Sequence, residues 1–320
     1  MAVDFFRLTK APRKGLVAVE WATLAYALFT SLLILLLFGR MDHPGRMLLE
    51  RGAIVLTTLA MPWLYGKFPC KAMFFLRVAF QLGLLSYWYP DTYEFNRCFP
   101  NLDHVFASIE QFVFGGQPAL WFSNGFPHLL VSEAFNLGYF FYYPMMLIVM
   151  VYFCMFRFEE FDKASFLLIG SFFVYYFVYI FLPVAGPQFY FPAVGVEQVM
   201  AGSFPAVGDY FHHHQTLLPG PGYQHGFFYE LVEHSQQVGE RPTAAFPSSH
   251  VGISTLLMVM SWKADKRLFY GLAPLYMLLC AATVYIQAHY AIDSVVGFFS
   301  GIGLYWLMER FYDRRLVLRG

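Results

Sequence analysis

A-F-P-S-S-H-V-G, residues 245–252, joins a polar segment to the start of an apolar helix. Pro247 has the fixed φ that suits a first helical turn, and Ser248 and Ser249 are good N-cap residues. A helix that begins here presents free backbone N–H groups and its positive dipole end, which together bind anions well. His250 at this position is a candidate acid–base residue. Taken alone, the stretch fits an ordinary capped helix equally well.

The composition is that of a membrane protein. Hydrophobic residues make up 58% of the 320 residues and charged residues 13%, against about 25% charged residues in soluble domains. The formal net charge of zero argues against a nucleic-acid partner. The basic start, residues 1–14, precedes an apolar run without a small-residue cleavage site, so we interpret that run as a retained helix. The four scattered cysteines indicate neither a disulfide framework nor a metal cluster.

The apolar runs predict an all-α, polytopic membrane bundle of about eight spans, because a span needs about 20 mostly apolar residues. We place the spans at residues 16–38, 52–65, 73–89, 129–156, 166–184, 246–262, 268–288 and 291–308. Residues 102–122 are apolar at mixed helical spacing and are interrupted by Gly115 and Gly116, so we expect an interfacial segment there. Residues 90–101 and 186–244 are expected to be loops on the non-cytoplasmic side.

The distribution of Lys and Arg predicts that both termini are cytoplasmic. On that side this topology places Arg7, Lys10, Arg13, Lys14, Lys67, Lys71, Arg157, Lys163, Lys263, Lys266, Arg267, Arg310, Arg314, Arg315 and Arg319. The opposite side holds Arg40, Arg46, Arg51, Arg97 and Arg241, and Arg77 lies within the third span. His250 is therefore expected on the non-cytoplasmic face.

The short basic turn at residues 263–267 makes the next helix return to that face, so His289 arrives at the same membrane level as His250. His289 and Asp293 are four residues apart, a spacing that places both on one face of a helix. A carboxylate in that position accepts an imidazole N–H, fixes the tautomer and raises the basicity of the other ring nitrogen. Such an arrangement is typical of an oriented nucleophile. An interfacial hydrogen bond without a catalytic role is the alternative.

The two-part pattern P-S-x-H followed by H-x-x-x-D resembles the signature of the type 2 phosphatidic acid phosphatase superfamily. The resemblance implies that His289 attacks phosphorus to form a phosphohistidine, that Asp293 orients it, and that His250 protonates the leaving oxygen. Ser248 and Ser249, with the amides after them, would hold the phosphoryl oxygens. It also implies a six-helix catalytic core and no metal. We accordingly divide the chain into N-terminal transmembrane helices, 1–100, and a catalytic membrane domain, 101–320.

The chain departs from the superfamily pattern where phosphate-binding cations are normally found. Ala282 and Thr283 stand where the third motif has Ser-Arg, and L-P-V-A-G-P-Q-F-Y-F, residues 182–191, stands in place of K-x6-R-P. At these positions the chain resembles the inositol phosphorylceramide synthases, which transfer a phosphoinositol headgroup from a phospholipid to ceramide. The shared features are Thr283, the H-Y-x-x-D ending at residues 289–293 and Gly186-Pro187.

Arg241 is the candidate cation, because it is the single Lys or Arg in the long loop. It either binds the phosphoryl group or pairs with Glu240 or a lipid phosphate. Gln188 and Tyr190 either line the substrate pocket or belong to a helix-terminating turn. The run His212-His213-His214 is interpreted as a polar turn rather than a metal site, because consecutive side chains diverge and no ligand set completes it.

We therefore predict an integral-membrane phosphotransferase with a phospholipid donor, a lipid alcohol acceptor and no cofactor, its site on the non-cytoplasmic face. One alternative is a lipid phosphate phosphatase, in which water is the acceptor. A remote alternative is a transporter, for which Arg77 is the single deep charge. The sequence does not show whether a partner subunit is needed.

Overall fold

The computed structural model describes residues 5–9 and 13–317, apart from the side chains of Val238, Arg315, Leu316 and Val317. Of the cations used to predict the orientation, Lys10 and Arg319 lie outside the described residues, as does the side chain of Arg315.

All regular secondary structure in the described part of the chain is helical, which confirms the predicted all-α class. Its first half contains α1 (Ala18–Leu37), α2 (Pro44–Lys67), α3 (Lys71–Gly83), α4 (Leu85–Asn96), α5 (Asp103–Phe114), α6 (Pro118–Gly125), α7 (Leu129–Phe140) and α8 (Tyr142–Phe156). The second half contains α9 (Phe161–Phe181), α10 (Pro187–Val194), α11 (Val196–Met200), α12 (Tyr210–His213), α13 (Phe227–Gly239), α14 (Ser249–Ala264), α15 (Lys266–Tyr285) and α16 (Ala291–Val317). Two 3-10 turns, Phe38–Arg40 and Phe158–Glu160, complete the set.

Among the described residues, five helices are long and apolar enough to cross a membrane, or six if the bent pair α7 and α8 is one span. The chain is thus a multi-pass membrane protein, while the count of eight spans is not confirmed. The second span is longer than predicted because α2 begins at Pro44, well before residue 52. Its first turns contain Arg46 and Arg51, and these charges made the segment look too polar for a membrane span. In the structure Arg46 pairs with Glu50, and Arg51 is buried and donates to the Thr30 hydroxyl.

The two predicted loops are wrong in part, because both contain helices. Residues 90–96 continue α4 through Pro90. The stretch 186–244 contains α10 to α13. Glu133 of α7 accepts the backbone N–H groups of Phe228 and Tyr229 at 3.0 Å each, so the start of α13 is capped by a distant element that local sequence cannot reveal. The predicted break after 114 is confirmed, since α5 ends at Gly115 with a left-handed φ of 75°.

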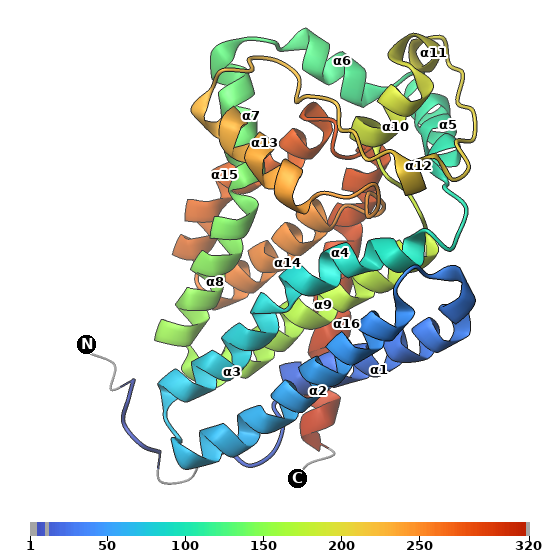
Figure 1. Cartoon of the computed structure of the whole chain (residues 1–320). Coiled ribbons are helices and arrows are strands. Elements are labelled where there is room, and N and C mark those ends of the chain that lie inside the picture. The colour runs from blue at the N-terminus through green and yellow to red at the C-terminus, as the bar shows by residue number, and fades with distance from the viewer. Residues whose placement is uncertain (1–4, 10–12, 318–320) are drawn as a thin grey trace. The chain divides into compact units, whose positions relative to one another are not determined.

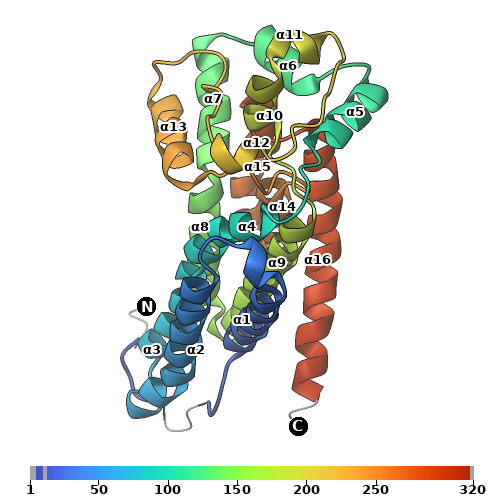
Figure 2. The same ribbon diagram turned by 45° about the vertical axis from the view of Figure 1, so that its right-hand side comes forward.

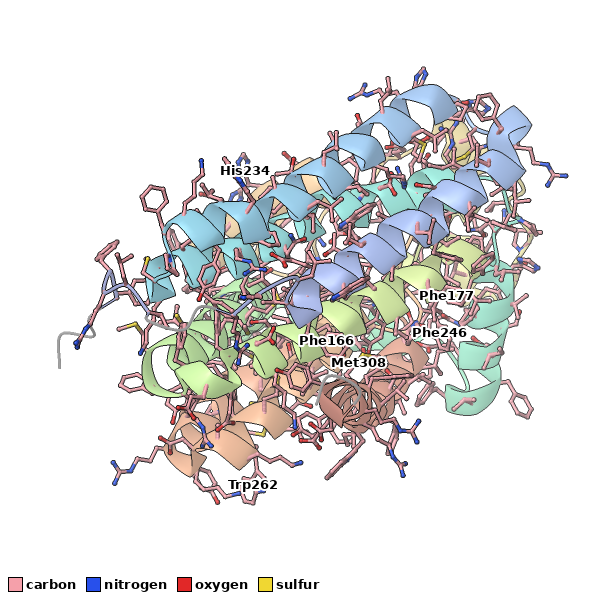
Figure 3. All side chains as sticks on the ribbon, turned by 90° about the horizontal axis from the view of Figure 1, so that it is seen from below. Phe166, Phe177, His234, Phe246, Trp262 and Met308 are labelled. Carbon is pink, nitrogen blue, oxygen red and sulfur yellow. The ribbon has the colours of Figure 1, made fainter. Side chains whose placement is uncertain are left out.

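The chain divides into two compact units, each described here by itself. The first comprises Met1–Tyr89, Met150–Phe173 and Leu307–Gly320. Arg77 and Glu20 form a fully buried ion pair there, with Nη2 and Oε2 2.6 Å apart, and Glu20 also accepts the N–H of Val17 at the start of α1. Phe166 and Met308 lie together against Gly170 (Figure 3). Arg77, the deep charge on which the transporter alternative depends, thus forms an ion pair that joins α3 to α1.

The second unit comprises Pro90–Val149 and Val174–Trp306. The short helices α5, α6, α10, α11, α12 and α13 gather at one end of it, over α14 and α15 (Figures 1 and 2). On α5, Val105, Ile109, Phe112 and Val113 are exposed, whereas the opposite face is buried. This amphipathic pattern is that of an interfacial helix.

Glycines let α16 approach α14 closely within the second unit. A Cβ on Gly297 would lie 2.6 Å from the carbonyl oxygen of Ser248, and one on Gly301 would overlap the carbonyl oxygen of Gly252. Small residues four apart permit this kind of backbone contact between membrane helices. The contact holds the first turn of α14, which carries His250, against α16.

We predict that Gly301→Ala lowers the free energy of unfolding by about 1–3 kcal/mol, because the added methyl group is forced into a packed backbone contact. Gly303→Ala on the same helix is the matched control, since a Cβ there meets nothing within 4 Å. The measurement is thermal unfolding of the detergent-solubilised protein. Equal effects of the two substitutions would contradict the close approach of α14 and α16.

Candidate active site

Three backbone segments meet at the candidate site. Ala245 donates its N–H to the carbonyl of Val184 at 2.9 Å, and Gln188 donates its N–H to the carbonyl of Gln287 at 2.9 Å. Gly186, with a φ of +92°, lies so close to the chain that a Cβ would be 2.7 Å from the carbonyl oxygen of Ala288. A side chain at this position is excluded by both φ and space. The Gly-Pro segment, the start of the P-S-S-H segment and the turn before α16 are therefore one hydrogen-bonded assembly.

The first turn of α14 is fixed by capping. The Ser248 hydroxyl accepts the N–H of Val251 at 3.3 Å, as an N-cap residue does. The Ser248 N–H donates to the carbonyl of Asp293 at 3.0 Å. The Ser249 N–H donates to the Tyr179 hydroxyl at 3.0 Å. Among the described residues, the backbone N–H of His250 makes no hydrogen bond, so this donor is available to a ligand.

The tautomer of His289 follows from its surroundings. Nδ1 lies 2.8 Å from the carbonyl oxygen of Ala245, and a carbonyl only accepts, so Nδ1 carries the proton. Nε2 then has a free lone pair, and it lies 3.4 Å from Nδ1 of His250. Burial lowers the pKa of His289 to about 4, against the opposing effects of the Ala245 hydrogen bond and the charge of Glu240. His289 is thus a neutral imidazole at physiological pH, as a nitrogen nucleophile must be.

Asp293 is not the hydrogen-bond partner of His289 in the structure. Its Oδ2 lies 3.8 Å from Nδ1 of His289 and accepts the N–H of Tyr290 at 2.8 Å. The predicted geometry required both residues to lie on one helix, but α16 begins at Ala291. Asp293 therefore caps its own helix from the first turn. Its Oδ1 is buried with no partner among the described residues.

His250 contacts two tyrosines that were not predicted to belong to the site. The ring of Tyr139 stacks on it with centroids 4.7 Å apart, and the ring of Tyr142 lies 4.4 Å away. These residues flank the junction of α7 and α8, where the helix axis bends by 45°. Two rings three residues apart in sequence therefore contact one imidazole. The aromatic run at 139–143 was the available signal.

The other predicted site residues have other partners. Arg241 donates from Nη1 to the carbonyl of Glu240 at 2.9 Å, and no carboxylate of the described residues forms an ion pair with it. Gln188 is buried and accepts from Gln236 at 3.0 Å. Tyr190 lies in an apolar cluster and donates to the carbonyl of Pro205 at 2.8 Å. Gln188 and Tyr190 therefore contribute to packing around the turn, and no contact places them on the histidines.

Two buried carboxylates of α5 are part of the site and were missed. Asp103 accepts the N–H groups of Ala185 and Gly186 at 2.7 and 2.8 Å. Glu110 accepts those of Ala291 and Ile292 at 2.9 and 3.1 Å (the start of α16 beside α5, Figure 2). Burial raises the pKa of Asp103 to about 6 and that of Glu110 to about 7. Their seven-residue spacing in an apolar segment puts both on one helix face and was the usable signal.

Phe246 fixes α5 against the P-S-S-H segment. Its ring and that of Phe106 have centroids 4.6 Å apart. As for metals, the described residues contain no group of three His, Cys, Asp or Glu side chains arranged to hold an ion. His214 stacks instead on Tyr210, with centroids 4.3 Å apart.

A family model described as the PAP2 superfamily matches residues 104–307, which is more than half of the chain. The matched range begins inside α5 and includes both histidines and Asp293. Among curated proteins and solved structures, none matches the chain.

The low pKa of His289 predicts a pH-dependent stability. Between pH 6.5 and about 4 the unfolded chain binds a proton at this residue and the native protein does not. The contribution of neutral His289 to the free energy of unfolding is therefore fully present above pH 6.5 and is lost as the pH falls toward 4. From pH 7 to pH 5 we expect the wild type to lose about 2 kcal/mol more unfolding free energy than His289→Gln. Parallel pH profiles of the two proteins in detergent would contradict a neutral, buried His289.

Proposed function

Because the chain belongs to the PAP2 superfamily, we propose that it is a lipid phosphotransferase, which moves a phosphoryl-headgroup from a phospholipid to a lipid alcohol through a phosphohistidine. The family supports chemistry of the lipid phosphatase or phosphotransferase type. The carrying observation is the pair of imidazoles, with the lone pair of His289 Nε2 3.4 Å from His250 Nδ1.

In the first half-reaction, Nε2 of His289 attacks phosphorus and the bond to the lipid alcohol oxygen breaks. His250, in its protonated form, gives its proton to that oxygen, so a neutral lipid alcohol leaves. The Ala245 carbonyl supports the step because it stabilises the positive charge that develops on the His289 ring. The free N–H of His250 and the dipole of α14 support the phosphoryl oxygens.

In the second half-reaction, neutral His250 removes the proton of an incoming hydroxyl, the hydroxyl oxygen attacks phosphorus, and the bond to Nε2 breaks. His289 is regenerated in its original tautomer, because the proton stays on Nδ1, which donates to the Ala245 carbonyl throughout. The imidazoles supply the nucleophile and every proton transfer.

The reaction requires the two rings to separate. A reacting phosphorus lies roughly 3–3.5 Å from its nucleophile before attack, and the leaving oxygen must also reach a proton donor. The observed gap of 3.4 Å between the two ring nitrogens does not hold both. His250 must therefore move along the faces of Tyr139 and Tyr142 when a substrate binds.

The lack of cations at the usual family positions favours a phosphodiester over a phosphomonoester. Thr283 stands where the third family motif has Arg, and residues 182–191, in place of the first motif, contain no Lys or Arg. A phosphodiester carries one negative charge and a phosphomonoester nearly two, so the diester needs fewer cations for its binding. This argument supports headgroup transfer, as in the inositol phosphorylceramide synthases, over hydrolysis of a lipid phosphomonoester.

We place the site on the non-cytoplasmic face with both termini cytoplasmic, on the strength of the Lys and Arg distribution. The donor would then enter laterally from that leaflet. The acceptor proposed is a ceramide-like alcohol, with diacylglycerol or water as the competing acceptors that the experiment must separate.

Purified protein incubated with labelled phosphatidylinositol and ceramide is expected to form a new labelled phospholipid. His289→Ala should lower its rate by more than about 1,000-fold, because the nucleophile is lost. The measurement is separation of the lipids. Release of water-soluble inositol phosphate alone, with no new lipid, would mean that water is the acceptor and would replace the transferase with a hydrolase.

We also predict that Arg241→Ala lowers kcat/KM by about tenfold, because a charged hydrogen bond to a phosphoryl oxygen contributes about 1.5 kcal/mol or more. Arg46→Ala is the control, since Arg46 is exposed and pairs with Glu50 in α2. If catalytic efficiency is the same in both variants, Arg241 has no part in the phosphate site.

A further inference from the structure

We infer that Asp103 and Glu110 of α5 are positioning residues, which brace the backbone on both sides of His289 and so hold its Nε2 in line for attack. The inference rests on the proposed function and assigns to α5 a part in it. Neither carboxylate touches the histidines. Each acts through main-chain N–H groups on the segments that carry them.

Asp103 joins the Gly-Pro segment to the residue after His289. Oδ2 accepts from Ala185, and Oδ1 accepts from Gly186 and from the Tyr290 hydroxyl at 3.1 Å. Gly186 is in turn pressed against the Ala288 carbonyl. One fully buried carboxylate thus fixes the chain immediately before and immediately after His289.

Glu110 fixes the next point along the chain. Its two oxygens accept from Ala291 and Ile292, which are the first N–H groups of α16 and have no partner within the helix. A carboxylate at this end also complements the helix dipole. Since Asp293 accepts from Tyr290, three consecutive backbone donors, at residues 290–292, are held by two carboxylates.

The turn that carries His289 needs this support because it has little regular structure of its own. α15 ends at Tyr285 and α16 begins at Ala291, and Gln287 between them has an unfavourable φ of +65°. The His289 N–H donates back to the Thr283 carbonyl at 3.0 Å, and its ring contacts the Ala245 carbonyl and the His250 ring. Without α5, only these contacts would set the direction of Nε2.

The two carboxylates also leave one backbone anion site open. The N–H groups of residues 185, 186, 291 and 292 are occupied by Asp103 and Glu110. The start of α16 is therefore closed to phosphate, whereas the His250 N–H at the start of α14 is free. Asp103 and Glu110, which together we call the α5 brace, thereby direct the phosphoryl group to the start of α14, the helix end that faces His289 Nε2.

The test compares Glu110→Gln with Glu133→Gln in the full-length protein. Glu133 makes the same paired contact, with the N–H groups of Phe228 and Tyr229, but at the start of α13. Gln keeps one acceptor oxygen and replaces the other with an amide that cannot accept. Amide exchange of peptides spanning 287–294 and 226–232 reports each local opening, and orthovanadate, a phosphate analogue, reports the geometry of the site without a known donor.

For Glu110→Gln we expect faster exchange in 287–294, a vanadate dissociation constant raised at least about tenfold, and kcat lowered by about 10–100-fold with KM changed by less than about threefold. For Glu133→Gln we expect faster exchange in 226–232, with kcat and vanadate affinity within about threefold of wild type. Faster exchange in 287–294 with unchanged kcat and vanadate affinity would overturn the inference.

Tyr290→Phe is the second variant, in case Glu110→Gln does not fold. It removes only the hydroxyl that donates to Asp103 and keeps the ring that packs on Phe191. We expect kcat to fall by about 3–10-fold, and an unchanged kcat would remove Asp103 from the brace. Failure of the proposed function looks different, since vanadate would then bind wild type and His289→Ala equally.

Discussion

The candidate site depends on one hydrogen bond, from Nδ1 of His289 to the carbonyl oxygen of Ala245 at 2.8 Å. It fixes the tautomer, frees Nε2 and links the second histidine segment to the chain just before the first. The links from Ala245 to Val184 and from Ser248 to Asp293 then join three distant stretches of sequence. The positions of both imidazoles follow from these contacts, since neither ring is held by a side-chain hydrogen bond to a carboxylate.

Carboxylates in this part of the molecule accept hydrogen bonds from backbone N–H groups. Asp103, Glu110 and Glu133 each accept two adjacent N–H groups. In a membrane, an unpaired N–H is costly, and a carboxylate that accepts two at once satisfies both with short, charge-assisted bonds. The consequence is a site whose carboxyl groups are occupied by the backbone and which is poor in cations. The phosphate-binding Lys and Arg of the family motifs have no counterpart at their usual positions, which is why the charge of the substrate becomes informative.

Much of this arrangement could be predicted from the sequence, because it depends on residues that are close together in the chain. The capping serines predicted the start of α14, and the helical hairpin after His250 predicted that His289 returns to it. What could not be predicted depends on contacts between distant segments. The partner of His289 was expected to be Asp293 by helical spacing, but the helix begins two residues after the histidine and a backbone carbonyl takes the place of the carboxylate. Likewise, the helix through Pro90 and the caps supplied by α5 and α7 rest on packing that no window of sequence contains.

The hydrogen-bond partner of His289 is a main-chain carbonyl, and this has a consequence for mutational studies. A main-chain carbonyl is present whatever side chain occupies position 245, so no ordinary codon change deletes the group that orients His289. Substitutions at position 245 would report on the packing of this buried residue and would leave the carbonyl itself in place. The contact becomes visible only when the backbone itself is altered, for example by replacing the 245–246 amide with an ester, whose carbonyl oxygen is a weaker acceptor.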